Sequence, residues 1–134
     1  MASTATPALS KLTPILQVER IEPSLPFWRS LGFTVVAEVP HEDGLGFVIL
    51  QRDGLELMIQ TIASMRADDA RMAPERATPT YLFVEVADLE AVRQGLVDAE
   101  ILLGPRDTFY GMREIFVREP GGNVVGLAEP IPQK

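Results

Sequence analysis

Apolar and polar residues alternate along most of this chain in short runs, a pattern typical of β-strands. The alternation predicts strands, in chain order, at Leu12–Val18, Phe33–Val39, Leu45–Arg52, Leu55–Thr61, Thr80–Val86, Ile101–Leu103, Arg113–Glu119 and Asn123–Ala128. Helices are predicted at Pro23–Leu31, which begins with proline and is followed by glycine, and at Leu89–Ala99, which Asp88 caps. The charged stretch Ile62–Ala77 is interpreted as a connector with room for a helical turn.

The order strand, helix and three strands occurs twice. Thr13–Val18 aligns with Tyr81–Val86, and Arg52 with Arg118, about half a chain length later. Such a repeat indicates duplication of one βαβββ unit, the alternative being a chance similarity of two α+β halves. One unit leaves a sheet face uncovered, so two must pair to build a core. We therefore predict an α+β fold of two paired βαβββ modules that form a curved sheet cleft. Its parts are a tail at 1–10, a first module at 11–62, a connector at 63–78, a second module at 79–130 and a tail at 131–134.

Alternation also assigns the side chains of each strand to one of two faces. One face is aliphatic, as in Leu82, Val84 and Val86, and suits packing under a helix. The other, which we call the mixed face, carries aromatic, amide, carboxylate and small residues: Thr13, Ile15, Gln17, Glu56, Met58, Gln60, Tyr81, Phe83, Glu85, Val124, Gly126 and Ala128. Two mixed faces that curve toward each other would enclose a half-polar cavity, the usual setting of a small-molecule site. The alternative is that both are outer surfaces of a sandwich.

The composition narrows the classes of partner. The 134 residues carry a net charge of −7, which argues against nucleic-acid binding and favours cationic ligands. The absence of cysteine excludes disulfides, thiolate nucleophiles and zinc–sulfur sites, and fits a cytoplasmic location. The first residues lack the pattern of a signal peptide, and no apolar run reaches the roughly 18–20 residues of a membrane helix. We expect neither a membrane nor a nucleic acid as partner.

Three motifs resemble those of a known superfamily. They are KLTPILQV from Lys11, PFWRSLGF from Pro26 and YGMREIFVREPGGN from Tyr110. Together with the duplicated plan they are similar to the vicinal-oxygen-chelate superfamily, which includes glyoxalase I, extradiol dioxygenases, fosfomycin-resistance enzymes and bleomycin-resistance proteins. Two departures are a helix motif one residue shorter than usual and Glu119 in place of the usual aspartate. The resemblance implies the fold; it does not select one activity.

Enzymes of that superfamily hold a divalent metal through four strands. By resemblance, these positions fall here on Thr13, Met58, Tyr81 and Gly126, which cannot replace imidazole and carboxylate ligands. The single histidine, His41, rules out a site of two histidines and one carboxylate and is interpreted as a solvated turn residue. Gly126 is interpreted as opening space for a ligand against the backbone.

The remaining chemistry is a set of carboxylates and aromatic rings. Glu56, Glu85 and Glu114 could form a rearranged metal site or an acid–base pair, but they fit better as partners of Arg113, Arg118 or a cationic ligand. Trp28 is interpreted as a core residue, and the loop 104–111 as a flap. The predicted ligand-binding residues are Thr13, Gln17, Phe33, Glu56, Met58, Tyr81, Phe83, Glu85, Tyr110, Arg113, Phe116 and Gly126.

These observations favour a metal-free small-molecule-binding protein of the bleomycin-resistance type. It would sequester a cationic or aromatic antibiotic-like ligand, without a cofactor or a catalytic residue, and by resemblance it would form a homodimer. One alternative is a glyoxalase- or dioxygenase-like enzyme with a displaced divalent-metal site. Another is a domain whose cavity has closed and whose role is protein interaction.

Overall fold

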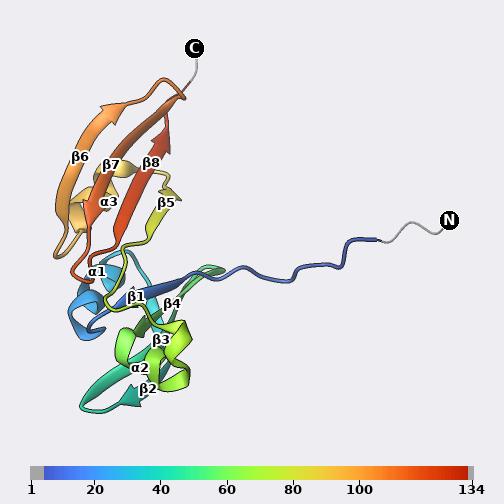
Figure 1. Ribbon diagram of the computed structural model, residues 1–134. Coiled ribbons are helices and arrows are strands. Elements are labelled where there is room, and N and C mark those ends of the chain that lie inside the picture. Colours follow the sequence, from blue (N-terminus) through green and yellow to red (C-terminus); the bar gives the residue numbers. More distant parts are fainter. Residues whose placement is uncertain (1–4, 133–134) are drawn as a thin grey trace.

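The computed structural model describes residues 5–132, which fold into two four-stranded sheets with short helices (Figure 1). Sheet A has the order β1-β4-β3-β2 and sheet B the order β5-β8-β7-β6. The strands of sheet A are β1 Ile15–Val18, β2 Thr34–His41, β3 Gly44–Arg52 and β4 Leu55–Thr61. Those of sheet B are β5 Tyr81–Glu85, β6 Glu100–Asp107, β7 Met112–Arg118 and β8 Val124–Pro130. The helical elements are η1 Glu22–Ser24, α1 Leu25–Ser30, α2 Ile62–Asp68, η2 Ala70–Met72 and α3 Leu89–Gly95.

The two sheets have the same topology, as expected for a duplicated unit. In each, the first strand pairs in parallel with the last, and the other pairs are antiparallel. Ile15 lies opposite Met58 in sheet A, and Phe83 lies opposite Gly126 in sheet B. The α+β fold of paired βαβββ modules is therefore confirmed.

The aliphatic faces of both sheets share one hydrophobic core. Its fully or nearly buried members include Leu16, Val18, Val48, Leu50, Leu57, Ile59, Ile115, Val117, Val125 and Leu127. Helix α1 adds Phe27 and Trp28, and Trp28 packs edge-on against Phe27 and Phe33 at ring-centroid distances of 5.1 and 5.5 Å. The assignment of strand faces by alternation and the core position of Trp28 are confirmed.

Several element boundaries differ from the sequence prediction. The first predicted helix is split into η1 and α1, because Pro26 lacks the N–H that a continuous helix would need at this position. Strand β2 continues to His41, so this histidine ends a strand and is partly buried; its interpretation as a solvated turn residue is wrong. Strand β6 runs to Asp107, so the first half of the predicted flap belongs to the sheet.

The turn between β7 and β8 keeps its shape with glutamate at position 119. The Glu119 carboxylate is buried and accepts hydrogen bonds from the backbone N–H groups of Gly121 and Asn123, at 2.8 and 2.9 Å. Asn123 in turn accepts one from the Thr80 backbone, at 2.9 Å. This carboxylate is therefore committed to the turn.

The connector after β4 folds over one end of the mixed face of sheet A. The Gln60 amide donates hydrogen bonds to Ser64 and Asp68 of α2, both at 3.1 Å. Gln17 accepts one from the Thr78 backbone at 3.3 Å. Figure 1 shows α2 in front of sheet A, whereas sheet B has its helix α3 behind it. The mixed face of sheet B is thus the more open of the two.

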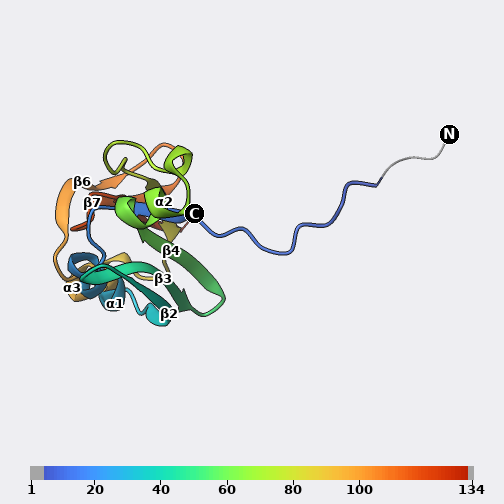
Figure 2. The same cartoon turned by 60° about the horizontal axis from the view of Figure 1, so that its bottom comes forward.

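Residues 5–12 form an extended amino-terminal arm in which every residue is exposed. Figures 1 and 2 show this arm running away from the two sheets in both orientations. Among the described residues, no helix is long and apolar enough to span a membrane.

Candidate ligand-binding site

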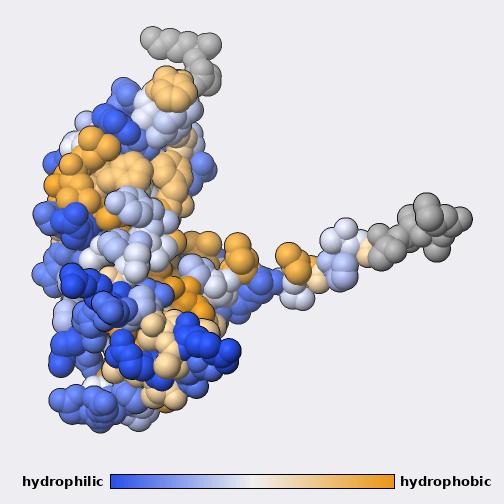
Figure 3. Space-filling model, in the orientation of Figure 1, coloured by the Kyte–Doolittle hydropathy of each residue, from blue (hydrophilic) through white to orange (hydrophobic). Residues whose placement is uncertain are grey.

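Aromatic side chains line the open mixed face of sheet B. Tyr81 and Phe83 are 72% and 53% exposed, and hydrophobic side chains gather over this sheet in the space-filling view (Figure 3). The Phe83 and Phe116 rings lie 6.3 Å apart, centroid to centroid, on either side of Gly126 in the strand register. Such rings offer stacking surface to a planar ligand.

Gly126 makes room for a protein side chain. A Cβ atom at this position would lie 2.6 Å from Cε2 of Phe116, so the ring already covers the backbone here. The interpretation that Gly126 leaves space for a ligand is therefore wrong. The glycine leaves room for the Phe116 ring beside β8.

Glu114 is a buried carboxylate on the mixed face of sheet B, near the loop that carries Tyr110. Its side chain is 0% exposed and accepts hydrogen bonds from the Tyr110 hydroxyl, at 2.7 Å to each oxygen. Arg106 adds an ion pair at 3.1 Å. The hydrogen bond to Glu114, followed by burial, raises the pKa of the Tyr110 phenol above its usual value. The partner of Glu114 is thus Arg106 on β6, and the expectation of Arg113 or Arg118 is wrong.

Arg113 does not join the mixed face. Because side chains alternate along β7, Arg113 points to the face opposite Glu114 and Phe116. Its guanidinium pairs with Asp107 at 2.8 Å, and this hydrogen bond lowers the pKa of Asp107. Its prediction as a ligand-binding residue has no support in this arrangement.

Glu56 is the corresponding carboxylate of sheet A. It accepts hydrogen bonds from Lys11 at 2.8 Å, Gln51 at 2.6 Å and Thr13 at 3.1 Å. The bond from Lys11, followed by that from Gln51, lowers the pKa of Glu56. Thr13 therefore contacts Glu56, whereas Met58 lies opposite Ile15. Both oxygens of Glu56 are already used by protein donors.

The arrangement does not fit the divalent metal that the superfamily's enzymes hold. Met58 belongs to sheet A and Thr13 precedes its first strand, whereas Tyr81 and Gly126 belong to sheet B. These four residues offer no imidazole or carboxylate. Within residues 5–132, no three or more His, Cys, Asp or Glu side chains gather closely enough to hold a metal ion. The nearest carboxylate, Glu56, has an ammonium group 2.8 Å away, which opposes a second cation.

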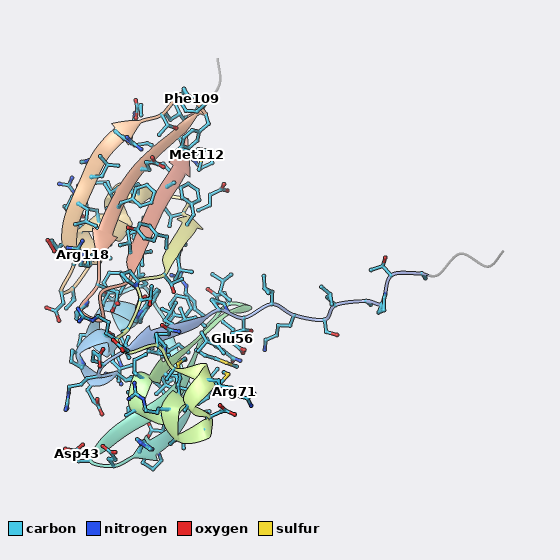
Figure 4. All side chains as sticks on the ribbon, in the orientation of Figure 1. Asp43, Glu56, Arg71, Phe109, Met112 and Arg118 are labelled. Atoms are coloured by element: carbon cyan, nitrogen blue, oxygen red, sulfur yellow. The ribbon has the colours of Figure 1, made fainter. Side chains whose placement is uncertain are left out.

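Side chains of both mixed faces meet in a groove at the junction of the two modules. The groove has a volume of about 460 Å³ and brings together Phe33, Glu56, Phe83 and Glu85 of the predicted residues. Figure 4 shows Glu56 at this junction, beside the base of the arm, and Phe109 at the far end of sheet B. Tyr110 follows Phe109 and packs against it, so it is far from the groove. Gln17, Met58, Tyr81 and Phe116 also lie outside the groove lining.

A wider depression of about 780 Å³ lies beside the edge of sheet A. It is lined by polar groups, among them Lys11, Arg29 and Arg52, and Glu56 alone is shared with the predicted residues. Arg52 is held by the Leu31 carbonyl at 2.6 Å and by Asp53 at 3.1 Å. These contacts fix the Arg52 side chain beside the turn between β3 and β4.

Sequence reasoning missed three donors that hold Glu56 and Glu114: Lys11, Gln51 and Arg106. Gln51 had a usable signal, since it lies directly across the Asp53-Gly54 hairpin from Glu56. The sequence held no usable signal for Arg106, because its position opposite Glu114 depends on the unexpected length of β6.

Comparison with known proteins identifies the family. Residues 9–127 match the model of the Glyoxalase/Bleomycin resistance protein/Dioxygenase superfamily. The chain belongs to this superfamily. No curated protein matches the sequence.

Several solved structures share the fold of this superfamily member. One is a glyoxalase/bleomycin resistance protein/dioxygenase from Nocardioides, with a TM-score of 0.73 and 20% identity over 96% of this chain and 89% of that chain. A bleomycin-binding protein complexed with bleomycin has a TM-score of 0.61 and 18% identity, over 90% and 98%. A lactoylglutathione lyase from Agrobacterium tumefaciens has a TM-score of 0.70 and 17% identity, over 92% and 95%. At these identities the likeness concerns the fold, which carries both binding proteins and enzymes.

Proposed function

We propose that this protein is a metal-free small-molecule-binding protein of the bleomycin-resistance type. It holds a cationic or aromatic, antibiotic-like ligand stoichiometrically and does not transform it. The observation that carries the proposal is a contrast between the acids and the rings of the mixed faces. Glu56 and Glu114 are bonded to protein donors, whereas Tyr81 and Phe83 remain exposed.

The ring surface supports binding of a planar molecule. Aromatic pairs contribute about 0.5–1.5 kcal/mol beyond the area they bury, so a ligand that stacks on Phe83 and Phe116 gains from both rings. The net charge of −7 raises the local concentration of a cation. Glu85, exposed beside Phe83 on β5, supplies a nearby carboxylate.

The enzyme alternative requires a metal at a displaced site. Its best-placed donors are Thr13 and Glu56, which are 3.1 Å apart. Lys11 would have to leave Glu56 before a divalent ion could bind there. Among residues 5–132, Glu56 belongs to no group of three or more His, Cys, Asp or Glu side chains that could hold a metal ion. The loss of the Lys11–Glu56 ion pair therefore counts against the enzyme alternative and favours the binding function.

A homodimer in the cytoplasm is part of the same proposal. Leu9 and Leu12 on the amino-terminal arm are 94% and 95% exposed, and burying such side chains against a second copy would stabilise a dimer. Sedimentation measures the mass directly. A particle of two chains supports the dimer, and a single chain at micromolar concentration contradicts it. Cell fractionation tests the location.

Calorimetric titration with a panel of planar cationic antibiotics, including bleomycin, tests the binding function. We expect one panel member at least to bind with a fixed stoichiometry and to be recovered unchanged. Phe83→Ala should weaken this binding about tenfold, since it removes a stacking ring, whereas Phe109→Ala, an exposed ring at the far end of the sheet, should not. A silent panel, or conversion of the ligand, contradicts the proposal.

A further inference from the structure

The groove between the modules has the size and lining of a small-molecule site. Its volume of about 460 Å³ lies in the range of such sites, about 300–1,000 Å³. The walls come from the β3–β4 turn, from β5 and from the base of the arm, and they are mainly apolar: Leu12, Pro14, Phe33, Leu55, Leu57, Leu82, Phe83 and Val84. Three polar side chains share this lining, namely Trp28, Glu56 and Glu85.

Trp28 presents a buried donor that lacks an acceptor. The residue is 1% exposed, and two edge-on ring contacts, with Phe27 and Phe33, fix its position. Its Nε1–H forms no hydrogen bond with any of residues 5–132. Folded proteins pair the large majority of buried polar groups, so an unpaired donor in the wall of a groove points to an acceptor that enters from outside.

A second buried donor without a partner among residues 5–132, the Ser24 hydroxyl, can be compared with the Trp28 N–H. The Ser24 hydroxyl is also buried without a partner, but Ser24 does not line the groove. It lies against the β7–β8 turn, where a Cβ on Gly121 would approach it. Of these two orphan donors among the described residues, only Trp28 belongs to the groove lining.

The carboxylates at the groove differ in their availability. Glu56 is neutralised by Lys11 and bonded to Gln51 and Thr13. Glu85 is exposed and forms no ion pair with any described residue. The rim of the groove therefore carries one uncompensated negative charge, which suits a cation.

We propose that this groove binds an apolar molecule with a hydrogen-bond acceptor that pairs with Trp28 Nε1–H at the floor and a cationic group that pairs with Glu85 at the rim. The proposal rests on the binding function proposed above and adds the position and chemistry of the ligand. The apolar body of the ligand lies between Phe33 and Phe83, so the aromatic surface of sheet B extends into the groove at Phe83.

A matched pair of amines tests this proposal on the native protein. Quinolinylmethylamine carries a ring acceptor and a cation, and naphthylmethylamine has the same shape without the acceptor. The chain has one tryptophan, so its indole N–H gives a single signal in a ¹H–¹⁵N spectrum. We expect the quinoline to move this signal downfield and to bind about three- to tenfold tighter than the naphthalene.

Glu85→Gln tests the rim independently, because an exposed carboxylate can be changed without disturbing the core. This variant should bind the quinoline amine about two- to fivefold more weakly, and should bind neutral quinolinylmethanol as the native protein does. Glu38 is an exposed carboxylate on the edge strand β2, so Glu38→Gln is the matched control. This control should change the affinity neither for the quinoline amine nor for quinolinylmethanol.

Three results would overturn the proposal. The first is an indole signal that moves equally with both amines, because the ring acceptor would then make no difference. The second is an equal loss of affinity for the quinoline amine in Glu85→Gln and Glu38→Gln. The third is no binding of the quinoline amine at millimolar concentration. If the antibiotic panel still binds in a Phe83-dependent way, the failure concerns the groove alone. If that panel is silent as well, the binding function fails with it.

Discussion

Replacing Gly126 by alanine places a methyl group where the Phe116 ring now lies. The added Cβ would be 2.6 Å from Cε2 and 2.8 Å from Cζ of this ring, well inside contact distance. These atoms are at the free edge of a half-buried side chain, so the ring can move toward Phe83 and the backbone stays in place. The cost should therefore fall near the lower end of the range for overpacking, about 1–3 kcal/mol.

A second effect acts in the opposite direction. Alanine restricts the unfolded chain more than glycine does, which stabilises a strand position by about 0.5–1 kcal/mol. We expect Gly126→Ala to lower the free energy of unfolding by about 1 kcal/mol in denaturant titrations. In a Phe116→Ala background the clash is gone, and the same change should be neutral or stabilising.

The double-mutant cycle isolates this contact. A coupling free energy of about 1 kcal/mol or more between positions 126 and 116 supports the packing role of the glycine. If Gly126→Ala is equally destabilising with and without the Phe116 ring, the glycine serves some other purpose and the reasoning is refuted.

Two pH-dependent predictions follow from the hydrogen-bonded carboxylates Glu56 and Glu114. Lys11 lowers the folded-state pKa of Glu56, so its contribution to stability is present above the unfolded value of 4.5 and is lost as the pH falls through the folded pKa. The stability difference between the native protein and Glu56→Gln should shrink below pH 4.5 in chemical denaturation, and a difference independent of pH would contradict this. Glu114 raises the pKa of Tyr110, so one of the two tyrosines should ionise above the ordinary value of 10.0 in an absorbance titration. Tyr110→Phe should remove this component, and Glu114→Gln should bring it down; an unchanged curve in either variant would rule out the pairing.

Alternation alone was enough to predict the strand faces and the shared core. Leu82, Val84 and Val86 are half-buried against the core, as expected from their period of two. The repeat gave the order of the elements because the two modules keep the same pattern. The same alternation would also have placed Arg113 on the face opposite Glu114, so that error lay in carrying over a motif residue without checking its face.

Other features depend on contacts that the local pattern does not encode. Strand β6 runs through Gly104 and Pro105 with irregular pairing to β7, and these residues usually end a strand, so its length was not expected. The filling of space at Gly126 depends on a ring from the neighbouring strand. The groove depends on how the turn before Leu55 packs near β5, which is a matter of tertiary structure.

The proposed binding function depends on how the two sheets arrange their side chains. Sheet topology pairs the first and last strand of each module, and Met58, Tyr81 and Gly126, three of the positions assigned to metal ligands by resemblance, lie on these strands. In this chain the four assigned positions carry a thioether, two hydroxyl groups and a glycine, and the carboxylates Glu56 and Glu114 are paired with Lys11 and Arg106. Tyr81, Phe83 and Glu85 remain exposed on the mixed face of sheet B, and the proposed binding function rests on them.

The most direct test of the central claim is a calorimetric titration of the purified protein with its best panel ligand, before and after treatment with EDTA, together with elemental analysis of both samples. The account predicts the same affinity and stoichiometry in both, with less than one equivalent of any divalent metal per chain. Binding that disappears with EDTA and returns with one equivalent of a divalent ion would contradict it.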